Sequence, residues 1–329
     1  MTIGRAYRAT GADRPYGDPR RAHGVAMEGY FWRFSDPQSG RVVVALCGVN
    51  RTADVPWATV CLAGHPGGFV RTADVRVAGA DSTRLGVWAG NDTFRADADR
   101  VRVDLGSDAR LDVSIRDAHP WPRRAFGGLG AAHALPALGQ YWHPHLLGGR
   151  AGGTATIAGA RLDLDGFQVY GEKNWGTAGF PGRWWWGQAQ GFQRPDACVA
   201  FAGGDVRVGP VTLPATALVV RLGDDLLRLG HPLTSPVTAE AGDGRWRLRG
   251  RSARWSVAVD ASATPRDAYV LPVPLPAAGR SVPGALEHLA GVLRVTVRRR
   301  GRVVFADESR LAGLEDGGVD RVDAELARR

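Results

Sequence analysis

The 329 residues of this chain predict an all-β protein with few short helices. The first observation is that short runs rich in β-branched and aromatic residues recur along the chain, most of them bounded by Gly, Asp, Asn or Pro. The second is strict alternation in Val101–Leu105 and Leu111–Ile115, which places apolar and polar side chains on opposite faces of a strand. The third is the scarcity of helical patterning, for which only Ser281–Ala290 and Val319–Ala327 are candidates.

The first part of the chain contains seven predicted strands. They are Tyr30–Phe34, Arg41–Cys47, Trp57–Leu62, Thr72–Val77, Thr83–Trp88, Val101–Leu105 and Arg110–Ile115. Turn sequences at Asp36–Gly40 and Ala89–Asp92 lie between neighbouring runs, so we expect antiparallel hairpins. Residues 119–139 are rich in Pro, Gly and Ala, and they predict a linker or cover segment.

Ten further strands are predicted after this linker. They are Gly153–Ile157, Arg161–Leu164, Trp184–Gln190, Cys198–Ala202, Ala215–Leu222, Asp225–Leu229, Trp246–Arg249, Trp255–Val259, Leu293–Arg298 and Val303–Ser309. An aromatic run, a turn and an aliphatic run occur at residues 30–48 and again at 184–203, each after a glutamate. This echo predicts two barrel-like modules, which we place at residues 1–125 and 126–329.

The composition predicts a globular protein rather than a disordered or membrane-spanning one. Hydrophobic residues make up 44% of the chain, enough for a sizeable core, and no run of about 18 apolar residues occurs. The net charge of +9 comes almost entirely from arginine, and the arginines are dispersed. Nucleic acid is therefore not an expected partner. The charge reflects either genome composition or an attraction to anionic lipid headgroups or to an acidic ligand.

The cysteines and the N-terminus indicate a cytoplasmic location. Cys47, Cys61 and Cys198 form an odd set at wide spacing, typical of buried thiols in a reducing compartment. A disulfide between Cys47 and Cys61 across a hairpin is the minor alternative. Residues 1–24 are polar and contain no apolar segment, so no secretion signal is predicted and any membrane contact would be peripheral.

The densest chemistry in the chain lies at residues 170–188, where turn residues alternate with indoles and polar groups. Glu172 stands beside Lys173, the only lysine, and four tryptophans follow, three of them at Trp184–Trp186. On a strand Trp184 and Trp186 share one face. Aromatic faces beside an isolated carboxyl suit an apolar substrate and a developing carbocation. The structural alternative is an ion pair between Glu172 and Lys173 that fixes a loop, with the indoles as packing.

Two glutamates are candidate acids. Burial among indoles would raise the pKa of Glu172 and keep it protonated as a general acid, whereas Lys173 would lower that pKa, and the sequence leaves both effects open. Glu28 opens an aromatic strand. It is either a second carboxylate at the same pocket mouth or the partner of Arg33 or another arginine.

No cofactor or metal is predicted. His143 and His145 would share one face of a strand, but a metal needs three or four ligands and no spaced partner is evident in the sequence. They are instead hydrogen-bonding groups of a pocket or plain structural histidines. The glycines at residues 127–130 lack the strand and helix pattern of a nucleotide site, and neither a phosphate-binding loop nor a serine nucleophile elbow is present.

The motif residues resemble the tocopherol cyclase family. The resemblance rests on Glu172-Lys-Asn-Trp-Gly176, Phe180-Pro181 and Trp184-x-Trp186-x-Gln188, and on the more distant segments Glu28–Arg33 and Ala200–Asp205. It implies two lipocalin-like antiparallel β-barrels, as in the related hydroxyneurosporene synthase and Diels–Alderase proteins. It also implies cofactor-free chemistry on a hydrophobic isoprenoid substrate.

The same resemblance implies that a prenyl alkene is protonated and that a phenol oxygen then closes a chroman ring. Such a reaction needs a desolvated acid, aromatic faces that exclude water, and reacting atoms about 3–3.5 Å apart. We therefore expect a prenylated quinol or phenol as the substrate. The expected catalytic residues are Glu172 and Asn174, with Glu28 as the alternative acid. Lys173 and Arg33 are expected to hold the carboxylates in place. The expected substrate-binding residues are Tyr170, Trp175, Trp184, Trp186, Gln188, Tyr30, Trp32, His143 and His145.

Three other activities remain open for such barrels. Water could replace the phenol, which would make the protein an alkene hydratase. The cavity could template a cycloaddition, which needs shape and polarisation but no strong acid. It could also carry an isoprenoid unchanged, and a carrier needs the aromatic lining but no carboxyl beside it.

Overall fold

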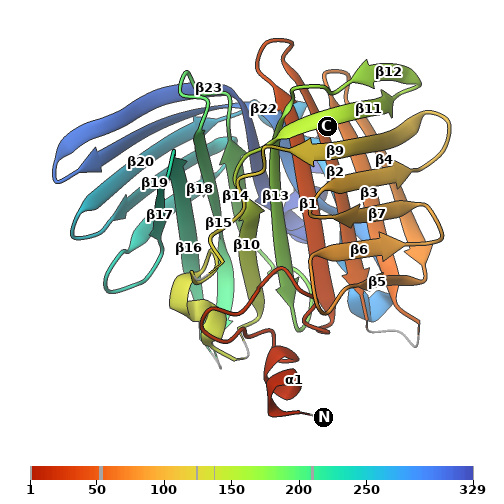
Figure 1. Ribbon diagram of the computed structural model, residues 1–329, viewed down its shortest axis with the longest axis horizontal. Helices are drawn as coiled ribbons and strands as arrows, with labels where there is room; N and C mark the ends of the chain where they lie inside the picture. Colours follow the sequence, from red (N-terminus) through yellow and green to blue (C-terminus); the bar gives the residue numbers. More distant parts are fainter. Residues whose placement is uncertain (1, 52–54, 124, 137, 209–210, 329) are drawn as a thin grey trace.

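Two large antiparallel sheets make up most of the protein in its computed structural model (Figure 1). The structure describes residues 2–51, 55–123, 125–136, 138–208 and 211–328. Within these residues the helices are α1 (Ile3–Arg8), α2 (Val319–Leu326) and three 3-10 turns, Gly130–Ala134, Pro265–Asp267 and Pro276–Ala278. The predicted all-β fold with few short helices is confirmed.

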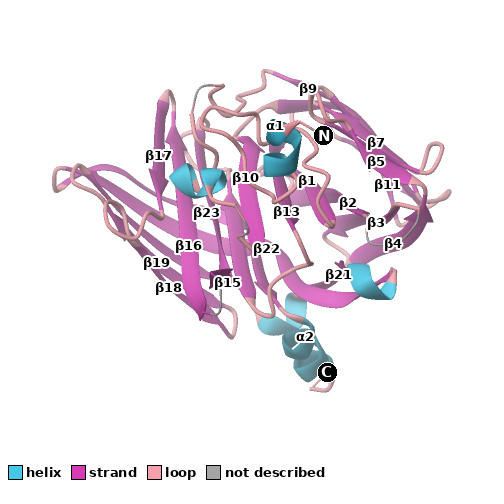
Figure 2. Cartoon of the chain, turned by 90° about the horizontal axis from the view of Figure 1, so that it is seen from below, coloured by secondary structure: helices cyan, strands magenta, loops and turns pink. Residues whose placement is uncertain are grey.

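The first sheet takes its strands from residues 27–176. They are β1 (Met27–Asp36), β2 (Arg41–Asn50), β3 (Trp57–His65), β4 (Phe69–Arg76), β5 (Ala78–Ala80), β6 (Gly86–Ala89), β7 (Phe94–Asp97), β8 (Arg100–Asp104), β9 (Ala109–Arg116), β10 (Gln140–Leu146), β11 (Arg150–Ile157), β12 (Ala160–Asp163) and β13 (Gln168–Gly176). The order is β4-β3-β2-β1-β13-β11-β9-β8-β7-β6-β5, with β10 beside β13 and β12 beside β11. The sheet curves until β2 contacts β5 and β6, so it forms a barrel-like shell (Figure 2).

The second sheet begins after Gly176. Its strands are β14 (Trp184–Ala189), β15 (Ala197–Val208), β16 (Val211–Leu222), β17 (Asp225–Leu229), β18 (Val237–Gly242), β19 (Arg245–Arg251), β20 (Trp255–Ser262), β21 (Tyr269–Leu275), β22 (Arg280–Arg299) and β23 (Arg302–Gly317). The order is β17-β16-β15-β14-β23-β22-β20-β19-β18, with β21 beside β22. β16 also contacts β18, so this sheet too curves around an interior.

Apolar clusters hold this arrangement together, and three of the largest are described here. They form because alternate side chains of each strand point to opposite faces. Trp32 and Phe94 lie in the core of the first sheet, and Phe201 and Trp246 in the core of the second. A third set of side chains packs the outer face of the first sheet against β14 and β21–β23. It includes Val42, Val44, Cys61, Ala63, Trp184, Leu271, Ala285 and Leu289. The two barrels therefore share a buried interface.

One predicted helix is wrong and the other is confirmed. Ser281–Ala290 belongs to strand β22, which pairs with β21 on one side and β23 on the other. Residues 284–289 of this strand are all buried. A strand covered on both faces carries no apolar–polar alternation, which is the pattern that would have identified it. Val319–Ala327 was expected to be helical, and α2 occupies it.

The change of sheet does not coincide with the domain boundary placed between residues 125 and 126. Strands β10–β13 follow that boundary but belong to the first sheet, and the chain reaches the second sheet only between residues 177 and 183. The expected linker at residues 119–139 contains a 3-10 turn and covers one end of the cavity described below. Division into two folding units remains a prediction.

Strand β13 holds the central position of the first sheet, although its sequence did not identify it as a strand. It pairs with β1 along nine residues and with β10 on its other side. Gly171, Lys173 and Asn174 have low strand propensity, and burial on both faces hides the alternation. Pairing with two neighbours overrides that local preference.

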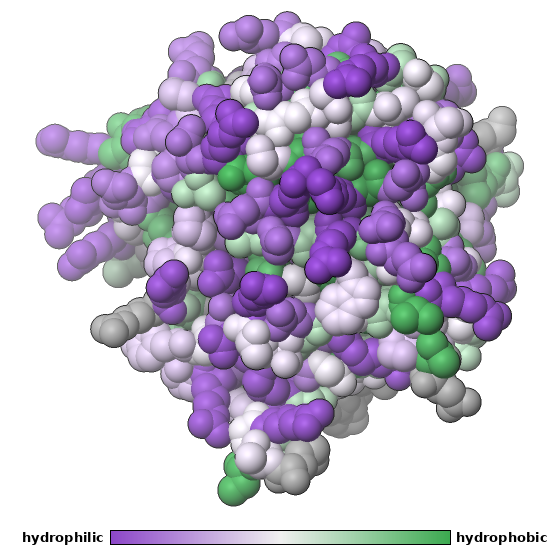
Figure 3. Space-filling model, turned by 45° about the vertical axis from the view of Figure 1, so that its right-hand side comes forward, coloured by the Kyte–Doolittle hydropathy of each residue, from purple (hydrophilic) through white to green (hydrophobic). Residues whose placement is uncertain are grey.

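The three cysteines are free and buried, as expected for reduced thiols. In the β2–β3 register Cys47 lies opposite Val60 and Cys61 opposite Leu46, so the two cysteines are not cross-strand partners. Hydrophilic side chains predominate on the face shown in Figure 3. No helix in the described part of the chain has the length and apolar character needed to cross a membrane.

Candidate active site

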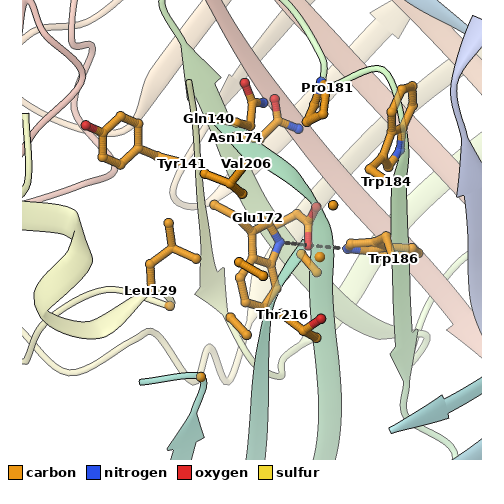
Figure 4. Close-up of a pocket in the computed structure, with 18 of the residues that line it drawn as sticks. Leu129, Gln140, Tyr141, Glu172, Asn174, Pro181, Trp184, Trp186, Val206 and Thr216 are labelled. Atoms are coloured by element: carbon orange, nitrogen blue, oxygen red, sulfur yellow. Dashed lines mark hydrogen bonds between the residues drawn. The ribbon is translucent and has the colours of Figure 1, made fainter. Parts of the chain in front are cut away.

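A cavity of about 920 Å³ is lined by residues from both sheets. The first sheet contributes side chains from β1–β3, β10 and β13, and the second contributes β14–β16 and β21–β23. Residues 126, 128–132, 138, 228–232 and 234–237 also line it. Figure 4 shows Leu129, Tyr141, Val206 and Thr216 around a space into which Glu172 projects. A large apolar cavity with a few converging polar groups is the usual form of a small-molecule site.

The alternation of β13 places its polar residues on two different faces. Glu172 and Asn174 line the cavity, and Tyr170 on the same face bonds to Glu172. Lys173 and Trp175 point to the other face, into the neighbourhood of β1 and the N-terminal segment. The strand therefore separates the one lysine of the chain from the carboxyl that precedes it.

Glu172 is held by three hydrogen bonds that all reach the same oxygen. Its Oε2 accepts from the Tyr170 hydroxyl at 2.6 Å, from Trp186 Nε1 at 2.7 Å and from Trp142 Nε1 at 2.8 Å. The Trp186 contact is drawn in Figure 4. The side-chain hydrogen bonds found for this carboxyl within the described residues leave Oε1 free to carry a proton toward the cavity.

Burial raises the pKa of Glu172 to about 7, and the three hydrogen bonds partly oppose that rise. Removal of a carboxylate from water disfavours its charged form, whereas donors to the carboxylate favour it. A carboxyl with this balance is protonated in a large fraction of molecules near neutral pH. Its conjugate base is already solvated by fixed donors, which is the arrangement expected of a general acid.

Indoles and phenyl rings surround this acid. Trp184 and Trp186 leave the same face of β14, as the alternation predicted, and Trp185 of the opposite face also lines the cavity. Trp186 packs edge-on against Phe31 with ring centroids 5.3 Å apart. Trp142 of β10 is a partner of Glu172 that the sequence did not single out. The sequence analysis considered only the neighbouring histidines, and no strand was predicted over residues 140–146 from which the direction of Trp142 could follow.

Unpaired polar atoms lie beside the acid. Asn174 Oδ1 and both side-chain polar atoms of Gln140 are buried without a hydrogen-bond partner in the described structure. Gly29 lies so close to Asn174 that a Cβ there would sit 2.6 Å from Oδ1. Buried polar atoms without protein partners are unfavourable, and both residues line the cavity, so these amides are suited to bind a polar group of a ligand.

Two further carboxyls reach the same cavity, and the sequence did not indicate either. Glu287 of β22 and Glu315 of β23 are directly opposite each other in the strand register, and Glu315 is opposite Trp186 on β14. Both line the cavity. Trp184 Nε1 donates to Glu315 Oε1. Glu287 fell in the segment predicted as a helix, and Glu315 lay beyond the last predicted strand, so no pattern connected them.

Glu28 does not reach the cavity, which corrects its expected place at the pocket mouth. It lies on the opposite face of the sheet, where Lys173 Nζ approaches its Oε2 at 2.7 Å and Arg51 pairs with its Oε1. Burial alone would raise the pKa of Glu28, but Lys173 and Arg51 hold it well below its usual range. The carboxylate is therefore permanently charged and unsuited to donate a proton. The expectation that Lys173 holds a carboxylate applies to Glu28 and not to Glu172.

The ion pair between Lys173 and Glu28 belongs to a larger buried network. Lys173 Nζ also donates to the backbone oxygen of Arg21 and lies 3.0 Å from His23 Nδ1, and His23 Nε2 lies 2.8 Å from Asp13 Oδ2. The backbone N–H groups of residues 23 and 24 donate to the Glu28 carboxylate. This network fixes the N-terminal segment against the back of β13.

Four expected substrate-binding residues lie on that far face and do not line the cavity. Trp175 stacks on His23 at 4.3 Å and donates from Nε1 to the Gly11 oxygen. His143 accepts from the Gly128 N–H, while Trp32 and His145 pack together in the first barrel. The cause is the two-residue period of β1, β10 and β13, which directs neighbouring motif residues to opposite sides.

The remaining expected residues lie at or beside the cavity. Tyr30 contributes to the lining, although its hydroxyl bonds to Glu28. Gln188 accepts from Arg33 Nη1 at 3.2 Å. Arg33 also donates to the backbone oxygens of Leu289 and Leu311, so it ties β1 to the second sheet rather than holding Glu28.

The fold and this site define a class of protein: paired antiparallel β-barrels with a desolvated carboxyl among indoles. Residues 98–318 match the model of the family described as tocopherol cyclase-like, and this match spans more than half of the chain. The chain belongs to that family.

A relative and two solved structures extend the comparison. The probable chloroplastic tocopherol cyclase of Oryza sativa subsp. japonica is 28% identical over 223 residues, which are 64% of this chain and 47% of that protein. The chain thus spans about half the length of this relative. CghA with Sch210972 is 14% identical, with a TM-score of 0.60 and coverage of 89% and 88% of the two chains. Kievitone hydratase from Nectria haematococca is 14% identical, with a TM-score of 0.53 and coverage of 91% and 90%. These structures concern the fold, and they confirm two lipocalin-like antiparallel β-barrels.

Proposed function

We propose that this protein is a cofactor-independent cyclase that closes a chroman-type ring on a prenylated quinol or phenol. The observation that carries the proposal is Glu172: a carboxyl inside a large apolar cavity, with three donors on one oxygen and a pKa of about 7. Membership of the tocopherol cyclase-like family and the name of the rice relative support a cyclase or a related isoprenoid-modifying activity. The particular substrate is our inference from the cavity.

The first step is transfer of the Glu172 proton to the alkene. The O–H bond at Oε1 breaks as a C–H bond forms at the less substituted alkene carbon, and a tertiary cation results. Negative charge then develops on the carboxyl, where Tyr170, Trp142 and Trp186 already donate to Oε2. Donors that are in place before charge develops need no reorganisation during the reaction, which lowers the barrier.

The second step is capture of the cation by the phenol oxygen. The faces of Trp184, Trp186 and Phe31 border the cavity and can stabilise positive charge while keeping water out. The unpaired amides of Asn174 and Gln140 can bind the ring hydroxyls and hold the oxygen near the alkene carbon. A carrier protein would need the aromatic lining but not a buried acid with fixed donors.

The test is incubation of the purified protein with prenylated quinols and phenols in deuterated water, followed by mass spectrometry. An isomer that contains one non-exchangeable deuterium is the expected product. Glu172→Gln should lower its formation at least about 100-fold, the usual contribution of a positioned acid. Glu240→Gln, which changes an exposed glutamate on β18, is the matched control and should leave the rate unchanged.

Other outcomes identify the alternatives. A product heavier by one water would indicate a hydratase. An isomer without deuterium, formed equally by Glu172→Gln, would indicate a pericyclase. Bound lipid that is unchanged after incubation would indicate a carrier. Each of these three results would contradict the proposed cyclase.

A further inference from the structure

The cavity opens to solvent on one part of the protein surface. Within the described part of the chain, most residues that line the cavity are buried or half-buried. The lining residues that are exposed are residues 131, 213–215, 230–232 and 234. They come from the 3-10 turn after residue 129, from β16, and from the loop between β17 and β18. We call the surface that these residues form the mouth of the cavity.

Strand pairing connects the mouth to the acid. From the exposed Leu213, strand β16 runs inward to Thr216, which is buried and also lines the cavity. Strand β15 lies between β16 and β14, and its residue Ala202 is opposite Trp186, the indole that bonds to Glu172. Figure 4 shows Thr216, Trp186 and Glu172 around the same space. A ligand that enters at the mouth therefore reaches the acid along β14–β16.

Large apolar side chains are exposed around this opening. Leu233, on the loop between β17 and β18, is 87% exposed, and Leu213, which lines the cavity itself, is 53% exposed. Leu135 is also 53% exposed and lies between the lining residues Ala132 and Leu138. Single exposed apolar side chains are ordinary on a protein surface. Several of them around the opening of an apolar cavity indicate a surface that binds a partner.

The charge around the mouth is predominantly positive. The segments that form and support the mouth are residues 119–138, 206–217 and 226–238, and they contain four arginines and no aspartate or glutamate. Arg228 lines the cavity, and its guanidinium lies 5.9 Å from the centroid of the Phe126 ring. An exposed acid beside the mouth is Asp205, opposite Pro214 in the strand register. An apolar surface with several cations and few anions complements an anionic partner.

We propose that the mouth docks on the surface of a membrane that contains anionic lipids. Leu135, Leu213 and Leu233 insert among the lipid headgroups, and the arginines face the lipid phosphates. Burial of apolar side chains and attraction to anionic lipids act together in such binding. This docking surface goes beyond the proposed function, which concerns chemistry inside the cavity. It also serves that function, because a prenylated substrate dissolves in lipid and could enter the cavity without crossing water.

A membrane fits this surface better than a second copy of the chain. In a symmetric dimer each mouth would face an identical mouth, so the arginines of one copy would meet those of the other. A bilayer instead presents phosphate groups to the arginines and an apolar interior to the leucines.

The experiment measures binding to lipid vesicles. Wild-type protein, Leu233→Ser, Leu213→Ser and the control Leu326→Ser are mixed with vesicles of phosphatidylcholine alone or of equal parts phosphatidylcholine and phosphatidylglycerol. Bound protein is separated by flotation at low and at high salt. Leu326 is an exposed leucine on α2 that does not line the cavity, so it matches the mouth leucines in chemistry but not in place. Exposed leucines contribute little to the core, so all three variants should fold.

We expect wild-type protein to bind the mixed vesicles more tightly than phosphatidylcholine alone, and high salt to weaken this binding. Leu233→Ser should lower the vesicle partition coefficient about 10-fold, since full burial of a leucine side chain contributes at least one factor of ten. Leu213→Ser should lower it by a smaller factor, because this side chain is already half-buried. Leu326→Ser should bind like wild type.

Several results would overturn the proposal. Wild-type protein might bind neither kind of vesicle, or bind both equally, which would exclude a role of charge. Loss of binding in Leu326→Ser equal to that in Leu233→Ser, or no loss in either mouth variant, would show that the mouth is not the docking surface. A dimer in solution that Leu233→Ser dissociates, without vesicle binding, would assign the mouth to a second copy. Cyclisation is not measured, so each of these results leaves the proposed function to its own test.

Discussion

The hydrogen bond from Tyr170 to Glu172 allows the acid to be tuned by removing a single oxygen atom. Tyr170 is fully buried, and its hydroxyl lies 2.6 Å from Oε2. Tyr170→Phe keeps the ring and removes only this donor, while Trp142 and Trp186 still donate to the same oxygen. Since the lost bond favours the carboxylate, the pKa of Glu172 should rise.

The size of the shift follows from the strength of the bond. A hydrogen bond to a charged group contributes about 1.5–3 kcal/mol, and one pKa unit corresponds to about 1.4 kcal/mol. The pKa of about 7 should therefore rise by about 1–2 units in Tyr170→Phe. Cyclisation needs protonated Glu172, so the wild-type rate should fall as pH rises through about 7, and this fall should move to higher pH in the variant. The plateau rate should be lower, because a weaker acid transfers its proton more slowly.

The assay is the rate of cyclised product between pH 5 and 10 under saturating substrate. Tyr269→Phe is the matched control, because it removes a tyrosine hydroxyl that bonds to His65 rather than to Glu172. A descending limb at the same pH in Tyr170→Phe and wild type would refute the reasoning, as would a move to lower pH. A purely structural defect would reduce the rate at all pH values and leave the pH at which the rate falls unchanged.

Three further predictions concern stability and reactivity. The folded protein holds the Glu172 proton more tightly than the unfolded chain, so the stabilisation from this proton is complete below about pH 4.5 and is lost as pH rises to about 7. In urea unfolding, the free energy of unfolding should therefore fall less between pH 5 and pH 7 for Glu172→Gln than for wild type. Lys173→Met leaves Glu28 without its ammonium partner and should lower the free energy of unfolding by about 3–5 kcal/mol. Arg194→Ala, the control, breaks the exposed ion pair with Asp196 and should lower it by under about 1 kcal/mol in the same experiment. The three buried cysteine thiols should resist a thiol reagent at pH 8 in the native protein and all react in denaturant, because burial raises their pKa.

Local patterns predicted the fold class and identified two of the three hydrogen-bond donors of Glu172, Tyr170 and Trp186, as site residues. Turn residues and alternation identified most strands, and alternation correctly placed Trp184 and Trp186 on one face of β14. Glu172 stood out because an acid, the one lysine and several indoles rarely occur together. These features are local, so adjacent residues are enough to reveal them.

The partners of the acid depend on strand pairing, which local patterns do not contain. Trp142 reaches Glu172 because β10 pairs with β13, and Glu315 reaches the cavity because β23 pairs with β14. Pairing of β1 with β13 likewise brings Lys173 beside Glu28. Strand β13 and residues 284–289 of β22 are buried on both faces, so these stretches carry no alternation from which the contacts could have been anticipated.

The two faces of β13 make the register of this strand a chemical requirement as well as a structural one. A slip of one residue against β1 would turn Glu172 and Lys173 each to the opposite face of the sheet. The ammonium would then enter the apolar cavity and the acid would join the ion-pair network. Deletion or insertion within β13 should therefore abolish activity even in a chain that still folds, while length changes at residues 177–183 leave this pairing intact. Laboratory evolution toward new substrates is accordingly best directed at cavity-facing positions, with the spacing of β13 kept constant.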